Sequence, residues 1–119
     1  MIDKNYRIAV VGASNNPMKY GNIVMRDLIT KGYNVVPVHP SEKIILKIPV
    51  YRNLKAVMKN INLVIFVVPP KITEKVLIDV KEMKIPKVWM QPGSESLNAI
   101  KFCEDNKIEC IHNSCIMFK

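Results

Sequence analysis

The feature that most constrains the fold of this chain is a regular alternation of short β-branched runs with amphipathic segments. Five runs have the composition of strands, at residues 8–11, 34–38, 63–68, 87–90 and 108–111. Helical patterns separate them, at about 22–31, 54–59, 73–83 and 97–103. Such alternation predicts parallel strands joined by right-handed crossovers, with helices on both faces of the sheet. We therefore expect an α/β, Rossmann-like fold of three layers with a mostly parallel five-stranded sheet.

Two of these runs also predict where their strands lie in the sheet. The run from Leu63 to Val68 is continuously apolar, which is typical of a parallel strand buried on both faces. The second run contains Pro37, which has no N–H to donate to a ladder. We therefore expect an edge or near-end position for the second strand.

Length and composition predict one globular domain, residues 1–119, with a core that needs no disulfides. The three cysteines are odd in number and form no C-x-x-C pair, so we expect buried, reduced thiols. The N-terminus lacks the apolar stretch of a signal peptide, and the longest apolar run is too short to span a bilayer. We expect a soluble, cytoplasmic protein that does not bind membranes.

The formal net charge of +8 favours anionic partners. The lysines are scattered, and many lie close to acidic residues, as in the segment 71–82. That pattern is typical of a solvated helix face rather than a nucleic-acid-binding stripe. A small molecule that carries phosphate accounts for the charge equally well, and we expect no nucleic-acid binding.

In an open α/β sheet, ligands bind outside the carboxyl ends of the strands. This rule selects four segments as candidate binding loops, 12–21, 39–47, 68–72 and 91–96. In the first of them, Gly12 permits a sharp turn, and the small residues Ala13 and Ser14 let a ligand approach the backbone. Free N–H groups at the start of the next helix can hold a phosphate.

Three other chemistries have weaker support. The dinucleotide fingerprint G-x-G-x-x-G fails at Ser14 and Pro17, and His39 stands where an acidic residue would hold an NAD ribose. A metal site built from Cys110, His112 and Cys115 would be cramped and would lack a fourth ligand. His39 as a base and Cys115 as a nucleophile have no evident partner groups. We expect no metal site and no catalytic residues.

Six short motifs, in this order and spacing, are similar to those of a known family. They are Val10-Val11-Gly12-Ala13-Ser14 with Pro17 and Gly21; Gly32-Tyr33 with Val36-Pro37-Val38-His39-Pro40; Pro49-Val50-Tyr51; Val67-Val68-Pro69-Pro70; Val88-Trp89-Met90-Gln91-Pro92-Gly93; and Asn113-Ser114-Cys115-Ile116. Nearly the whole chain thereby resembles the stand-alone CoA-binding domain family, which is related to the N-terminal CoA-binding domain of the succinyl-CoA synthetase alpha subunit.

The resemblance implies that the domain binds coenzyme A or an acyl-CoA. The first loop would wrap the diphosphate, the loop after the second strand would meet the adenosine end, and the Pro-Pro and Gln-x-Gly turns would line the remaining wall. The expected cofactor-binding residues are Gly12, Ala13, Ser14, Asn15, Pro17, Lys19, Tyr20, Gly21, His39, Pro40, Lys43, Val68, Pro69, Pro70, Gln91 and Gly93.

The sequence departs from the family at two places in the second loop. His39-Pro40 replaces the usual Asn-Pro, and Lys47 occupies a place where glycine is common. We expect Lys43, or as second choice Lys47, to meet the 3′-phosphate of CoA, because a partly enclosed phosphate needs a cation.

The synthetase's phosphohistidine and nucleotide-binding parts have no counterpart in the sequence, so we expect CoA binding without complete catalytic machinery. A small enzyme acting on a nucleotide or an acyl thioester, and a regulatory subunit that recruits a partner, stay open as alternatives.

Overall fold

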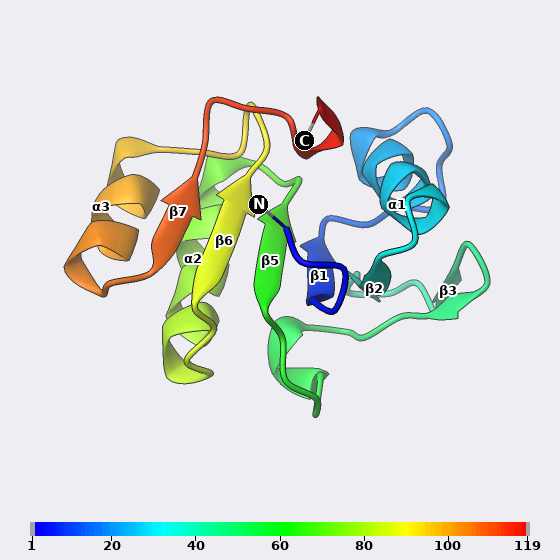
Figure 1. Ribbon diagram of the computed structural model, residues 1–119, viewed down its shortest axis with the longest axis horizontal. Coiled ribbons are helices and arrows are strands. Elements are labelled where there is room, and N and C mark those ends of the chain that lie inside the picture. Colours follow the sequence, from blue (N-terminus) through cyan, green and yellow to red (C-terminus); the bar gives the residue numbers. More distant parts are fainter. Residues whose placement is uncertain (1, 119) are drawn as a thin grey trace.

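The sheet has five parallel strands, in a computed structural model that describes residues 2–118. In chain order they are β1 (Arg7–Val11), β2 (Asn34–Val38), β5 (Leu63–Phe66), β6 (Lys87–Met90) and β7 (Glu109–Ile111). Their order across the sheet is β2-β1-β5-β6-β7 (Figure 1). The predicted α/β fold with a five-stranded parallel sheet is thus confirmed. Within residues 2–118, no helix has the length and apolar character needed to cross a membrane.

Both positional predictions about the strands are confirmed. β5 is the central strand, and all four of its residues are buried. β2 lies at an edge, where Tyr51 forms an isolated parallel bridge with Val38. The backbone N–H of Tyr51 donates to the carbonyl of Pro37 on that outer side. Because the amide and carbonyl of one residue in a strand point the same way, the missing N–H of Pro37 costs no ladder bond with β1.

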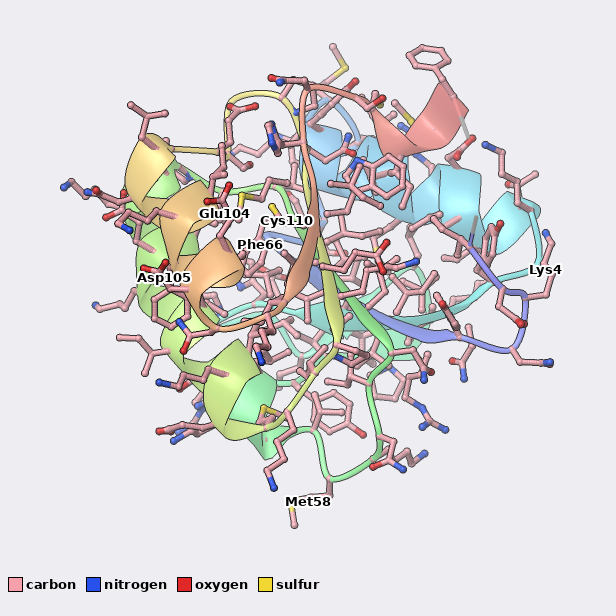
Figure 2. All side chains as sticks on the ribbon, turned by 60° about the vertical axis from the view of Figure 1, so that its left-hand side comes forward. Lys4, Met58, Phe66, Glu104, Asp105 and Cys110 are labelled. Atoms are coloured by element: carbon pink, nitrogen blue, oxygen red, sulfur yellow. The ribbon has the colours of Figure 1, made fainter. Side chains whose placement is uncertain are left out.

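The helices form the two outer layers (Figure 1). The helix α1 (Tyr20–Thr30) and the short 3₁₀ helix η2 (Ile116–Phe118) cover one face, where they share a core cluster with Ile8, Val10 and Ile65. The helices α2 (Pro70–Glu82) and α3 (Leu97–Asp105), with the 3₁₀ helix η1 (Leu54–Ala56), cover the other. Phe66 of β5 and Cys110 of β7 belong to the core cluster on that second face of the sheet, whereas Met58 is 90% exposed at the periphery (Figure 2).

Some element boundaries differ from the sequence prediction. α2 begins at Pro70 rather than near Thr73, because proline fits the first helical position, where its missing N–H is not needed. The segment expected as a short helix over 54–59 forms only the single turn η1. The segment expected as a loop after His39 contains a small hairpin of β3 (Ile44–Ile45) and β4 (Ile48–Pro49).

Candidate functional site

Hydrogen bonds between successive loops bring the carboxyl ends of the three neighbouring strands together. The N–H of Gly12 donates to Val38 O (3.4 Å), and that of Val67 donates to Val11 O (2.9 Å). The chain runs from β1 to β2 on one side, and its later strands lie on the other side of β1. The strand order therefore reverses between β1 and β5, and a crevice is expected at that point.

A cleft of about 460 Å³ lies at this point. Its lining comes from the loop after β1, the start of α1, the end of β2 and the β5–α2 connection: Gly12, Ala13, Ser14, Lys19, Tyr20, Gly21, His39, Pro40, Val67, Val68 and Ile72. Three of the four segments selected from the sequence therefore share one cavity.

Two glycines allow the backbones around the cleft to approach closely. Gly12 has φ +102°, and a Cβ there would lie 2.2 Å from the carbonyl oxygen of Val67. A Cβ on Gly21 would lie 1.9 Å from the carbonyl oxygen of Gly12. Since neither position can hold a side chain without movement of backbone, the first turn of α1 rests directly on the loop.

A buried amide holds this loop in place. Asn22, which is 3% exposed, donates from Nδ2 to Ser14 O (2.8 Å) and accepts at Oδ1 from Arg26 Nε (2.7 Å). Arg26 also donates from Nη2 to Pro17 O (3.0 Å). No side chain caps the N-terminus of α1, and although the N–H groups of Lys19 and Asn22 donate to backbone carbonyls, those of Tyr20 and Gly21 stay available.

A second, smaller pocket of about 200 Å³ adjoins the cleft, since both are lined by His39 and Pro40. The rest of its wall is Ser41, Glu42, Lys43, Val50 and Arg52. His39 Nδ1 accepts the backbone N–H groups of Ser41 (3.1 Å) and Glu42 (3.0 Å). This nitrogen therefore organises the loop and is not free to act as a base.

The β3–β4 hairpin explains why glycine is common at the place of Lys47. Its two turn residues, Leu46 and Lys47, have φ values of +49° and +68°. Two-residue hairpin turns with both residues at positive φ favour glycine or asparagine. Lys47 lines neither pocket, and the cations around the second pocket are Lys43 and Arg52.

The residues after β6 and β7 meet beside the cleft. Gln91 is fully buried, and its Oε1 accepts the N–H of Ile116 (2.8 Å), which turns its Nε2 toward Cys115 Sγ (3.2 Å). The hydroxyl of Tyr20 lies 3.4 Å from the same sulfur. Burial acts to raise the pKa of the Cys115 thiol, but hydrogen bonds from Tyr20, Gln91 and the Met117 backbone outweigh it, so that pKa lies below its ordinary value.

The structure brings together nine of the expected binding residues in the cleft: Gly12, Ala13, Ser14, Lys19, Tyr20, Gly21, His39, Pro40 and Val68. Lys43 lines the adjoining pocket. The remaining six, Asn15, Pro17, Pro69, Pro70, Gln91 and Gly93, line neither of these two cavities. Asn15 instead ties the first loop to the hairpin, because its Nδ2 donates to Ile44 O (2.9 Å) and contacts Glu42.

The cluster Cys110, His112 and Cys115 does not converge. Cys110 Sγ lies 3.9 Å from Met90 Sδ, in the layer of α2 and α3, whereas Cys115 contacts Tyr20 and Gln91. Over residues 2–118 there is no group of three potential metal ligands.

Sequence reasoning missed Asn22, Arg26 and Arg52. Asn22 and Arg26 lie within the predicted helix, where a polar side chain is ordinarily expected to be exposed to solvent. Arg52 follows the Pro-Val-Tyr motif, and its place beside Lys43 depends on the Tyr51–β2 pairing. The one sequence signal that could have revealed Asn22 is an amide side chain in the first turn of a helix that follows a polar loop.

The fold and the cleft define a class of protein, a small doubly wound α/β domain with a ligand cavity at its topological switch point. Comparison with known proteins specifies the family. The chain belongs to the CoA-binding domain family, whose model matches residues 6–119. This match confirms the resemblance inferred from the six motifs.

One curated relative is a longer protein that this chain matches over only a part of its length. The alpha subunit of ADP-forming acetate–CoA ligase II from Pyrococcus furiosus is 37% identical over 76 residues, which are 63% of this chain and 17% of the relative. The chain thus spans about a sixth of that subunit. The uncharacterized protein YneT of Bacillus subtilis is 25% identical over 116 residues, 98% of this chain and 86% of its own.

Solved structures show the same fold. A conserved hypothetical protein of Pyrococcus furiosus has a TM-score of 0.91 and 41% identity, and the match covers 95% of this chain and 97% of that one. A hypothetical protein of Pyrococcus horikoshii has a TM-score of 0.91 and 30% identity, with 96% and 81% of the two chains covered.

Proposed function

We propose that this domain binds coenzyme A or an acyl-CoA in the cleft at the carboxyl ends of β1, β2 and β5, without complete catalytic machinery of its own. The observation that carries the proposal is the continuity of two cavities through His39 and Pro40. The first loop and the second pocket lie at the two ends of this continuous surface, as an elongated ligand requires. We call the second pocket the basic pocket, because Lys43 and Arg52 line it with a single acid, Glu42.

The diphosphate would lie against the first loop and the start of α1. The uncapped N-terminus of α1 offers N–H groups and the positive end of the helix dipole. Gly12 and Gly21 keep side chains out of this wall, and Lys19 adds a cation at its rim.

The adenosine end would occupy the second pocket, where Lys43 and Arg52 would meet the 3′-phosphate. Both side chains belong to exposed residues, so each contact with phosphate is screened by water. A charged hydrogen bond of this kind contributes about 1–2 kcal/mol, or roughly five- to thirty-fold in affinity, and screening by water lowers this to about ten-fold or less.

Isothermal titration calorimetry with CoA tests the proposal. We expect saturable binding with one site per chain and a rise in melting temperature. No heat and no thermal shift at millimolar CoA would eliminate CoA as the ligand.

Paired titrations with dephospho-CoA, which lacks the 3′-phosphate, test the placement of the adenosine end. Lys43→Ala and Arg52→Ala should each weaken CoA up to about ten-fold, and the effect should shrink as salt rises. The same variants should bind dephospho-CoA almost as the parent does. Lys59→Ala, at an exposed position outside both pockets, is the matched control. Equal losses for both ligands would mean that the two cations do not contact the 3′-phosphate.

A further inference from the structure

The cluster of Tyr20, Gln91 and Cys115 borders the cleft on the side opposite the basic pocket. Tyr20 is part of the cleft wall, and its hydroxyl lies 3.4 Å from Cys115 Sγ. Cys115 is only partly buried, and its sulfur lies within hydrogen-bond distance of a residue that lines the cavity.

The segment that carries Cys115 is fixed in place. After β7 the chain turns over the carboxyl edge of the sheet toward α1 (Figure 1). Trp89 Nε1 donates to Ser114 O (2.8 Å), and Lys31 Nζ donates to Met117 O (2.7 Å). With the bond between Gln91 and Ile116, these contacts hold the residues on both sides of Cys115.

The environment of this sulfur favours its ionised form. Both side chains that contact it can donate a hydrogen bond, Tyr20 from its hydroxyl and Gln91 from Nε2. A charged group that acts on this thiol is Asp27 of α1, which pairs with Lys31 Nζ at 2.9 Å. Burial and Asp27 disfavour the thiolate, and the hydrogen bonds from Tyr20, Gln91 and the Met117 backbone outweigh both effects.

The order of the strands relates this sulfur to the ligand. The basic pocket adjoins the end of β2, and Gln91 follows β6. Three strand intervals separate β2 from β6, or about 14 Å at the usual spacing. An extended CoA molecule that starts at the basic pocket has enough length to cross them, and its sulfur is the end that arrives near Cys115.

We propose that Cys115 is a thiol–disulfide exchange site for the sulfur end of a CoA-class ligand, an inference that rests on the proposed function. The Cys115 thiolate attacks one sulfur of a CoA disulfide and forms a new S–S bond, while the original S–S bond breaks. One CoA leaves as a thiolate and takes a proton from water, and the other stays joined to Cys115. Cys115 is oxidised and the departing CoA is reduced, so no other oxidant is needed.

Peptide-resolved mass spectrometry after incubation with micromolar CoA disulfide tests this proposal. We expect one CoA on Cys115, at least about ten-fold faster than glutathione from glutathione disulfide, because binding raises the effective concentration beside the sulfur toward millimolar. Cys103 and Cys110, in the other layer of the molecule, serve as internal controls and should stay unmodified. Equal rates with both disulfides, or modification of Cys110 first, would overturn the proposal.

Tyr20→Phe tests the role of the cluster. Loss of its hydrogen bond should move the midpoint of the rate–pH profile at saturating CoA disulfide upward, and Tyr33→Phe, which does not contact Cys115, should leave it unchanged. An unshifted profile in Tyr20→Phe would overturn the assignment of Tyr20.

Calorimetry of Cys115→Ser with CoA separates the two proposals. If CoA does not bind either this variant or the parent, the proposed function fails. If CoA binds both and Cys115 shows no preference for CoA disulfide, only the exchange proposal fails.

Discussion

Replacing Gly21 by alanine tests whether the first turn of α1 rests on the binding loop as tightly as the structure requires. The added Cβ would lie 1.9 Å from Gly12 O, whereas real Cβ atoms essentially never approach closer than 3.0 Å. One of the two segments must therefore move by at least 1.1 Å (3.0 − 1.9). The atom in the way is backbone, so no side chain can rotate to make room.

The magnitude follows from two opposing effects. Overpacking costs typically about 1–3 kcal/mol, and a rigid backbone neighbour places this site at the upper end. Alanine in place of glycine in a helix recovers roughly 0.5–1 kcal/mol. We expect a net loss of about 2 kcal/mol in the free energy of unfolding, which lowers the melting temperature of a domain this size by roughly 8 °C.

Urea unfolding monitored by circular dichroism measures this loss. The midpoint should fall while the m-value stays constant, since the unfolded surface is unchanged. Thr30→Ala, at the exposed end of the same helix, provides a control in which only helix propensity changes. A Gly21→Ala variant as stable as the parent, or more stable, would mean that helix propensity dominates and that the close contact does not exist. CoA affinity should fall in the same variant, because the shift displaces the loop that we propose binds the diphosphate.

Three further outcomes are expected. Ser96→Ala should cost about 1 kcal/mol in urea unfolding, because Ser96 Oγ caps α3 by accepting the N–H of Ala99 and also donates to Glu74; no loss would argue against the cap. Lys47→Gly should raise the free energy of unfolding by up to about 1 kcal/mol, since φ of +68° strains a residue with a Cβ; a loss would show that the Lys47 side chain has a structural role. NAD at the same concentration as CoA should not displace it in competition calorimetry, since His39 stands where a ribose-binding acid would be; displacement would overturn this reading.

The sheet was predictable from the sequence because its strands carry strong local signals. Burial of β5 on both faces makes Leu63–Phe66 continuously apolar. Pro37, which has no N–H to donate to a ladder, indicates that β2 is an edge strand. The start of α2 was not predictable from the rule that proline ends a segment, because the same residue also starts helices. The β3–β4 hairpin was missed because its strands have two residues each and its turn lacks glycine and asparagine.

The candidate site was predictable as a set of loops and less so as a set of side chains. The topology of a parallel sheet fixes which loops meet, so the cleft residues around Gly12 and Val68 follow from strand ends alone. Arg52 reaches the second pocket through contacts between segments distant in sequence. The hydrogen bond between Asn22 and Arg26 lies within one helix. Neither contact leaves a local pattern in the sequence. Gln91 follows a strand end as expected, yet the C-terminal segment covers it.

The number of strands between the two ends of the site sets the length that a ligand needs to engage both ends. Lys43 and Arg52 lie near the edge strand β2, and Cys115 lies near β6, so a ligand that engages both ends must cross β1 and β5. The first loop, which would hold the middle of such a ligand, is tied at two neighbouring residues, since Asn15 donates to Ile44 O of the hairpin and Ser14 O accepts from Asn22 of α1. A nucleotide without the pantetheine arm would engage the basic pocket and the loop but would stop short of the sulfur. In the proposed binding mode, the distance between the basic pocket and Cys115 would distinguish CoA from shorter nucleotides without a specific contact to the adenine.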